Sequence, residues 1–508
     1  MKKILFMLIF LSGLSALLQA QSSLDELEDY YKQALEDWEV PGMAVAIIQN
    51  DSLILSEGYG VSDINTGAKV DDKTLFAIAS NTKAFTAAGI GILVDQGKVE
   101  WDDKVIDHLP WFRMYSPYVT QEMTVRDLLC HRSGLKTFSG DLLWYGSEYD
   151  RREVVERARH LEPEYGFREQ FGYSNIMYLA AGLVIETVSG MSWDAFIKKH
   201  FFEPLDMERT ITSTRDLENF DNVAAPHNNL DEGIIAIDYL NWDNIAPAGS
   251  IISCVSDVKN WIKLQLQNGV FKNDTIFSKR VQHEMWSQHT PLSVSPYSRK
   301  MYPSTHFKSY GMGWSLFDYH GRKVVTHNGG YDGMISQTVL LPEEKAGFVI
   351  LTNSISGIYR ALMYKTMDYL LEAESKDWSK LFLKRYERYE KYKADQQAKK
   401  DSLRAKNTEP ALALKAYTGT YSGELYGDAK VSLIDGKLKI QLEPSPKFHS
   451  VMEHWHYDTF KIKFEEFPSL PRGWVNFIID RDGKVQEMRI DVPNPDFDFT
   501  ELKFYKQE

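Results

Sequence analysis

The chain has 508 residues, of which 43% are hydrophobic and 13% aromatic, and its formal net charge at pH 7 is -13. A chain of this length and apolar content forms large cores and divides into more than one domain. Its acidic balance argues against nucleic acid or an anionic membrane as a partner.

The first 20 residues have the pattern of a secretory signal peptide. Lys2 and Lys3 precede a mostly apolar run over residues 4–18, and Ala20 stands before a polar stretch. The run is too short for a stable membrane span, and no later run is long enough to cross a bilayer. We therefore expect an exported protein without a stable span, periplasmic in a cell with an outer membrane and extracellular otherwise.

The first candidate catalytic residues are Ser80 and Lys83, within a mostly apolar segment over residues 75–93. A spacing of three in a helix puts both side chains on one face, one turn apart. A serine hydroxyl needs a base to take its proton, and a lysine in a dry pocket can do so near neutral pH. The pair therefore predicts a nucleophile beside its base, although a buried serine and a surface lysine would show the same spacing.

Two later segments supply groups that such a serine needs. Tyr173 offers a phenol that can relay a proton, and Asn175 offers an amide that can hold the lysine or a substrate carbonyl. Farther on, a β-branched strand runs through His327 into Gly329 and Gly330, where backbone N–H groups can act as oxyanion donors. Alone, each segment also fits a packed loop tyrosine or an exposed strand end. The combination, in this order, favours a catalytic site.

In these motifs the chain resembles the serine β-lactamase and penicillin-binding protein superfamily, in particular its class C β-lactamase-like and D-alanyl-D-alanine carboxypeptidase branch. Residues 58–67 are similar to the family's first hairpin, and three more segments look like family segments, namely 128–135, 247–253 and 310–314. The resemblance implies an α+β fold. An antiparallel sheet of the β-lactamase/transpeptidase type would be flanked by helices, with an all-helical subdomain beside it.

The resemblance also implies a role for each candidate residue. Ser80 would form an acyl-enzyme, and Lys83 and Tyr173 would share the proton transfers of acylation and deacylation. Asn175 would orient Lys83 and the substrate. The backbone N–H groups of Ser80 and Gly330 would form the oxyanion hole.

His327 stands where the β-lactamases of this branch carry the lysine of a Lys-Thr-Gly motif. A fixed positive charge that binds a substrate carboxylate is thus replaced by a group whose charge depends on pH. The replacement fits peptidases, D-amino-acid peptidases and esterases at least as well as it fits β-lactamases.

Other chemistries find little support in the sequence. It contains no Gly-x-Ser-x-Gly elbow, no phosphate-binding Gly-x-x-x-x-Gly-Lys-Ser/Thr motif and no His-Glu-x-x-His zinc motif. We therefore expect neither a cofactor nor a metal. The expected substrate is a small molecule or a peptide, with peptidoglycan-derived peptides among the candidates.

Beyond residue 372 the composition changes. Residues 374–406 are dense in charged side chains with aromatics at helical spacing, which predicts an amphipathic helix. After Pro410, alternating segments flank Asp435-Gly436 and Asp482-Gly483, which are strong hairpin signals. They predict a small antiparallel β-barrel, because closure removes exposed strand edges. It resembles the lipocalin-like C-terminal domain of some members of the hydrolase family.

The expected organisation is a signal peptide over 1–20, a β-lactamase-like serine hydrolase domain over 21–372, a charged helical linker over 373–410 and a barrel over 411–508. Assembly of several copies through the C-terminal domain stays open.

We interpret the chain as an exported serine hydrolase that cleaves a small amide or ester through a Ser80 acyl-enzyme, such as a D-alanyl-D-alanine carboxypeptidase or a D-amino-acid peptidase. An esterase or a weak β-lactamase is the alternative. An alternative of another class is a non-catalytic protein that binds penicillin or peptidoglycan, but the presence of both Ser80 and Lys83 argues against it.

Overall fold

The computed structural model describes residues 23–230 and 233–508. The predicted signal peptide lies outside the described residues. Within those ranges no single helix is long and apolar enough to cross a membrane, although the bent pair Asn175–Ser189 and Trp193–Phe202 meets the same limits when taken together.

The centre of the larger domain is an antiparallel sheet of eight strands, which together with its helices confirms the predicted α+β fold. Across the sheet the strands follow the order β2 (Ser52–Gly60), β1 (Gly42–Gln49), β14 (Ala346–Thr352), β13 (Met334–Leu341), β12 (Arg322–Tyr331), β11 (Ser315–Tyr319), β10 (Lys308–Tyr310) and β9 (Thr290–Leu292). Strands from both ends of this domain's sequence thus meet at β1 and β14.

Both faces of the sheet are buried, which is why β1 is apolar at nearly every position. Val45 and Ile47 face a core shared with the helix over 23–37, α13 (Ile358–Leu370) and the start of α14 (Trp378–Ser402). Ala44 and Ala46 face the opposite core, which contains most of the remaining helices. The alternation follows from the two-residue period of a strand.

All but one of the remaining helices cover that second face and include the helical subdomain. They are α2 (Thr82–Asp95), α3 (Val105–His108), α4 (Pro117–Glu122), α5 (Val125–Leu129), α6 (Arg151–Arg157), α7 (Asn175–Ser189), α8 (Trp193–Ile197), α9 (Ala246–Gly249), α10 (Val255–Leu266) and α11 (Lys279–Met285). The exception is α12 (Pro296–Met301), whose Met301 packs against the first core. Nearly every residue of α2 is buried, as expected for a helix that is apolar on all sides.

The first hairpin lies earlier in the chain than residues 58–67. Strands β1 and β2 are joined by Asn50 and Asp51, with Gln49 paired to Ser52. Both turn residues have positive φ, 51° and 63°, which suits a two-residue hairpin. Residues 58–67 comprise the end of β2 and the turn after it, where Val61 and Lys69 form an isolated bridge.

Minor two-stranded sheets complete the larger domain. They pair β3 (Phe76–Ala77) with β6 (Ile252–Ser253), β4 (His227–Leu230) with β5 (Gly233–Ala236), and β7 (Val270–Phe271) with β8 (Asp274–Thr275). The first of them matters for the site, because β3 leads directly into the segment that contains Ser80.

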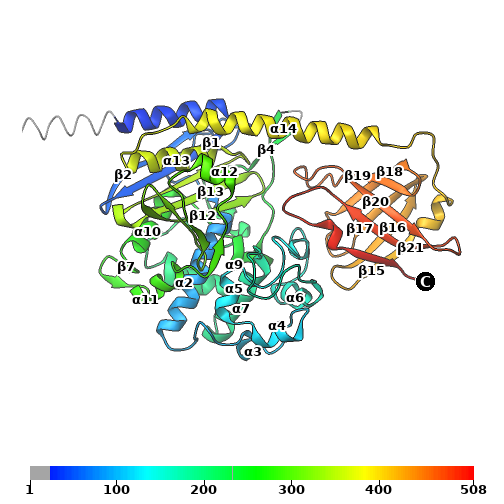
Figure 1. Ribbon diagram of the computed structural model, residues 1–508, viewed down its shortest axis with the longest axis horizontal. Coiled ribbons are helices and arrows are strands. Elements are labelled where there is room, and N and C mark those ends of the chain that lie inside the picture. Colours follow the sequence, from blue (N-terminus) through cyan, green and yellow to red (C-terminus); the bar gives the residue numbers. More distant parts are fainter. Residues whose placement is uncertain (1–22, 231–232) are drawn as a thin grey trace, which may run out of the picture.

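The C-terminal domain is a closed eight-stranded antiparallel barrel, as predicted. Its strands are β15 (Gly419–Gly423), β16 (Gly427–Ile434), β17 (Lys437–Leu442), β18 (His449–His456), β19 (Thr459–Ile462), β20 (Gly473–Ile479), β21 (Val485–Asp491) and β22 (Lys503–Lys506). Figure 1 shows α14 running along the larger domain and leading to this barrel. Trp378 and Phe382 bury the start of α14 against α13, whereas most of its second half is exposed.

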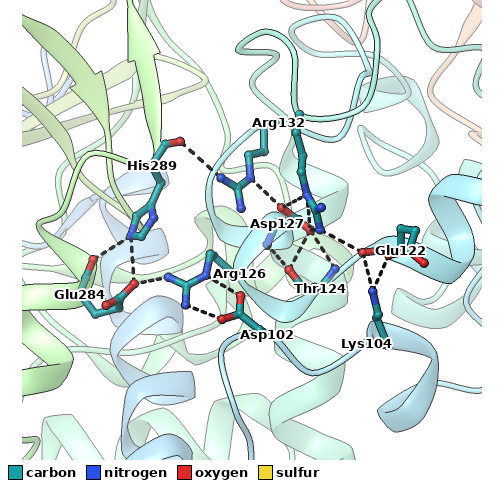
Figure 2. Close-up of polar contacts among 10 residues, drawn as sticks. Asp102, Lys104, Glu122, Thr124, Arg126, Asp127, Arg132, Glu284 and His289 are labelled. Atoms are coloured by element: carbon teal, nitrogen blue, oxygen red, sulfur yellow. Dashed lines mark hydrogen bonds and ion pairs between the residues drawn. The ribbon is translucent and has the colours of Figure 1, made fainter.

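A buried carboxylate anchors the segment from α5 to residue 134 (Figure 2). The Asp127 side chain is fully buried and accepts hydrogen bonds from Arg132 Nε at 2.6 Å and Arg168 Nη2 at 2.6 Å. It also completes a capping box with Thr124 at the start of α5. Burial raises the pKa of Asp127, but its hydrogen bonds outweigh that effect and hold the pKa below the ordinary value.

We expect Asp127→Ala to lower the free energy of unfolding by about 3–5 kcal/mol, because it leaves two arginines around a buried site without their carboxylate. Asp102→Ala is the matched control. Asp102 pairs with Arg126 but its side chain is 72% exposed, so its loss should cost no more than about 1 kcal/mol. Chemical denaturation of both variants measures the difference, and equal losses would contradict the assignment of Asp127 as the anchor.

Candidate active site

Ser80 lies in η1 (Ala79–Asn81), the turn that leads from β3 into α2. Ala79 has a φ of 46°, which is unusual for a residue with a Cβ. The turn is held by β13, since Ser336 Oγ donates to Ile78 O at 2.6 Å and accepts from Asn81 Nδ2 at 2.7 Å. Ser80 itself is partly exposed, so its hydroxyl is accessible from solvent.

Lys83 lies in the first turn of α2, one turn after Ser80, and is fully buried. Its Nζ lies 3.1 Å from Ser80 Oγ, 2.7 Å from Asn175 Oδ1 and 2.7 Å from the Ala248 carbonyl oxygen. Burial lowers the pKa of Lys83 to about 7, and the nearby Asp141 carboxylate opposes part of that change. A neutral amine has two N–H donors and one lone pair. If the two shorter contacts take the donors, the lone pair faces Ser80.

Tyr173 and Asn175 flank Ser174, whose side chain caps the N-terminus of α7. Lys83 Nζ lies 4.8 Å from the centre of the Tyr173 ring. Burial raises the pKa of Tyr173 above its ordinary value, and a hydrogen bond with the Ser80 side chain opposes this. The phenol is therefore protonated at neutral pH and in contact with Ser80.

Asp141 is a site residue that the sequence did not reveal. It is 2% exposed, and its Oδ2 accepts from Asn175 Nδ2 at 2.6 Å. Because a carboxylate accepts where an amide nitrogen donates, this contact turns Asn175 Oδ1 toward Lys83. Burial raises the pKa of Asp141 above the range usual for aspartate. No sequence pattern distinguishes Asp141 from other loop aspartates.

His327 is 4% exposed, and its imidazole is hydrogen-bonded on both sides. Nδ1 lies 2.6 Å from the Asn328 carbonyl oxygen and Nε2 lies 3.0 Å from the Tyr310 hydroxyl. A carbonyl only accepts, so Nδ1 carries the proton and Nε2 accepts from Tyr310. Burial lowers the pKa of His327 to about 3, and Lys83 adds to the effect. His327 is therefore neutral across the physiological pH range.

The His131 ring packs against two tyrosines of the site, Tyr173 and Tyr310. Its ring centre lies 4.1 Å from that of Tyr173 and 4.6 Å from that of Tyr310. Its Nδ1 accepts from the Ser174 N–H at 3.1 Å, and burial holds the pKa of His131 well below its ordinary value. His131 and Tyr310 belong to segments 128–135 and 310–314, whose resemblance to the family was noted without a role for either side chain.

Two glycines of β12 lie next to Ser80. A Cβ on Gly329 would stand 2.2 Å from Ile78 O and 2.8 Å from Ser80 N, so only glycine allows this approach. Tyr331 and Met334 close a two-residue hairpin. Alternation along β12 then makes Gly330 a non-hydrogen-bonded pair, with its N–H pointing away from β13. The pairing of β12 with β11 ends at Thr326, which leaves that N–H available to an oxyanion.

The structure thus brings all six predicted residues into one region. Ser80, Lys83 and Asn175 are joined by hydrogen bonds, and Tyr173 contacts Ser80 and Lys83. The ring centre of His327 lies 6.2 Å from that of Tyr173. Gly330 follows the glycine that touches the Ser80 backbone.

Family models match both parts of the chain. A family model described as Beta-lactamase matches residues 27–361, and one described as a domain of unknown function, DUF3471, matches residues 403–506. The Unguisins hydrolase ungD of Aspergillus violaceofuscus is 29% identical over 450 residues, covering 80% of this chain and 76% of that protein.

Solved structures are similar in fold. An octameric penicillin-binding protein homologue from Pyrococcus abyssi superposes with a TM-score of 0.62 at 21% identity, covering 95% of this chain and all of that one. A D-stereospecific amidohydrolase from Streptomyces sp. superposes with a TM-score of 0.54 at 22% identity, covering 67% of this chain and 97% of that one.

The rate at which a neutral fluorophosphonate phosphonylates Ser80 should rise with pH through about 7, because Lys83 must lose its proton before it can accept that of Ser80. Asp141→Asn should move this rise to lower pH, since the Asp141 charge raises the Lys83 pKa. Labelling rates measured from about pH 5 to about pH 9 test both statements. A flat profile in the native protein would contradict the assignment of Lys83 as the base.

Proposed function

Since the chain belongs to the Beta-lactamase family and is a serine hydrolase, we propose that it cleaves a small amide or ester through an acyl-enzyme on Ser80. The observation that carries this proposal is the buried Lys83 amine, 3.1 Å from the Ser80 hydroxyl.

Acylation follows from the contacts. Neutral Lys83 takes the Ser80 proton as Oγ attacks the substrate carbonyl carbon, and the carbonyl π electrons move to its oxygen. The N–H groups of Ser80 and Gly330 stabilise that oxyanion. The tetrahedral intermediate then collapses and the bond to the leaving group breaks. Tyr173, in contact with Ser80 and Lys83, donates its proton to the departing nitrogen or oxygen and takes up the proton that Lys83 received, so that Lys83 is neutral again.

Deacylation uses the same groups with water as the nucleophile. Neutral Lys83 accepts the water proton, relayed by the Tyr173 phenol, as the oxygen attacks the acyl carbon, and Lys83 returns the proton to Ser80 Oγ when the ester bond breaks. Asn175 keeps Lys83 in place through both steps, because its Oδ1 lies 2.7 Å from Nζ.

The neutral His327 bears on the substrate class. Lys83 already hydrogen-bonds Ser80, Asn175 and Ala248, and the imidazole already hydrogen-bonds Asn328 and Tyr310. Neither side chain therefore offers a positive charge to a substrate carboxylate at this position. We therefore favour substrates without a carboxylate at this position, such as D-amino-acid amides, D-amino-acid peptides and esters, over penicillins. The fold similarity to a D-stereospecific amidohydrolase supports the D configuration. A D-alanyl-D-alanine carboxypeptidase would need a carboxylate site elsewhere.

The basic and apolar start of the chain supports export to the periplasm or the cell exterior, where peptidoglycan-derived peptides occur as substrates.

Ser80→Ala should abolish both turnover and labelling by a fluorophosphonate, while the thermal midpoint stays close to that of the native protein. Lys83→Ala and Tyr173→Phe should each lower the acylation rate by about 10²- to 10⁴-fold, the usual effect of losing a positioned proton-transfer group. Intact mass after timed incubation gives both the rate and the number of adducts.

The matched control for this series is Ser309→Ala, which removes a buried serine hydroxyl of β10 outside the contacts described here. It should label like the native protein. A stable adduct on another serine in Ser80→Ala, or a near-normal rate in Lys83→Ala, would contradict the proposed mechanism.

His327→Lys should shift preference toward substrates with a carboxylate, because it places a cation where the native protein has a neutral imidazole. His327→Gln, which stays neutral and can still accept from Tyr310, is the control and should not shift preference. The ratio of kcat/KM for a cephalosporin to that for an uncharged ester measures the effect. Efficient cephalosporin hydrolysis by the native protein would refute the argument from His327.

A further inference from the structure

The barrel contacts the larger domain at the loop between Gly134 and α6, which also contains Asp141. In Figure 1 the barrel lies beside this part of the larger domain. Lys136 forms an ion pair with Asp498 of the barrel, and the Glu148 N–H donates to the Pro444 carbonyl at 2.9 Å. The two domains are therefore in direct contact, in addition to their connection through α14.

The contact nearest the site is made by Glu501, at the end of η9 (Phe499–Glu501). Its Oε1 accepts from Ser139 Oγ at 2.6 Å, and its Oε2 accepts from the Gly140 N–H at 2.8 Å. The Glu501 side chain is 17% exposed. The two carboxylate oxygens thus bind two consecutive residues of the larger domain, one residue each.

Gly140 is confined from the other side as well. It has a φ of 78° and precedes η2 (Asp141–Leu143), and a Cβ there would stand 2.6 Å from Leu161 Cδ1 and 2.8 Å from Ile176 Cδ1. The turn is therefore fixed between the helical subdomain and a carboxylate of the barrel.

The residue that this turn places is Asp141. From Glu501 the contacts pass through Gly140 to Asp141, then to Asn175 at 2.6 Å and from Asn175 to Lys83 at 2.7 Å. Asp141 orients the Asn175 amide so that its oxygen faces Lys83. A displaced Asp141 would free that amide to turn its nitrogen toward the amine, where a donor would compete for the lone pair that must accept the Ser80 proton.

A second contact fixes the other end of the same loop. The Tyr145 ring stacks on Phe497 of the barrel with a centroid distance of 4.0 Å, and its hydroxyl donates to Asp332 Oδ1 at 2.7 Å. Asp332 lies in the β12–β13 turn, two residues after Gly330. The barrel thus contacts this loop at two places. Glu501 contacts it next to Asp141, on the side of Lys83, and Phe497 contacts it at Tyr145, on the side of Gly330.

We propose that Glu501 is a positioning residue for the catalytic base, so that the barrel is a working part of the hydrolase site. This inference rests on the proposed acyl-enzyme function. Glu501 touches neither Ser80 nor the reacting atoms; it acts by fixing the turn that carries Asp141.

The test compares three full-length variants for the rate at which Ser80 is phosphonylated by a neutral fluorophosphonate, a reaction that stands in for acylation, together with the thermal midpoint. Glu501→Ala removes both hydrogen bonds and should slow acylation by about 10- to 100-fold, the effect of a misplaced catalytic group. Glu501→Gln can still accept from the Gly140 N–H and donate to Ser139 Oγ, so it should acylate within a few-fold of the native rate. Ser139→Ala removes one of the two bonds and should lie between them.

Lys503→Met is the matched control. It breaks another contact between the barrel and the larger domain, the exposed ion pair of Lys503 with Glu162, and should leave acylation unchanged. KM for a small ester should also stay unchanged in Glu501→Ala, because the substrate site is intact.

Native acylation in Glu501→Ala would overturn the proposal, as would a Glu501→Gln variant as slow as Glu501→Ala, since charge and not position would then matter. If Glu501→Ala does not fold, Ser139→Ala decides: a native rate there overturns the proposal and a reduced rate supports it. A native protein that does not label at Ser80 would instead refute the proposed function.

Discussion

A lysine side chain without exposure to water is the constraint around which this site is organised. Lys83 lies on a helix that is buried almost throughout, and its nitrogen lies within hydrogen-bond distance of three oxygens of the described residues. Burial disfavours the ammonium form of Lys83, and the neighbouring groups do not restore its pKa to the ordinary value. The two histidines of the site are neutral, because burial holds the pKa of His131 and that of His327 far below ordinary values. The region therefore provides a base without a permanent cation.

Much of this arrangement was predictable from local patterns. The three-residue spacing of Ser80 and Lys83 requires contact once the segment is helical, and the glycines after His327 require close approach of backbones. In the barrel, Asp435-Gly436 forms the predicted two-residue hairpin, with Ile434 paired to Lys437. The signal at Asp482-Gly483 also marks a hairpin, but its loop runs from 480 to 484, and Gln486 is an extra residue on β21 between the pairs Ile478–Glu487 and Ile479–Val485.

The features that escaped prediction all depend on contacts between distant segments. Asp141 has no neighbour in the sequence that marks it, and it becomes important only because folding places Asn175 beside it. The charge of His327 was open, since an imidazole titrates near neutrality until burial and the contact with Tyr310 decide its state. Likewise, no sequence pattern near Glu501 indicates that it binds Ser139, which lies 362 positions earlier.

The same long separations have a consequence for how the protein matures. Lys83 takes its contacts from residues 92 and 165 positions farther along the chain, and Gly330, the proposed oxyanion donor, follows later still. Contacts of such high sequence separation form slowly, because the chain loses the entropy of closing a large loop before the favourable contacts form. A partly synthesised or partly folded chain therefore carries an inert serine. Reactivity is a late property of the folded molecule, which protects the growing chain and its surroundings from premature acylation.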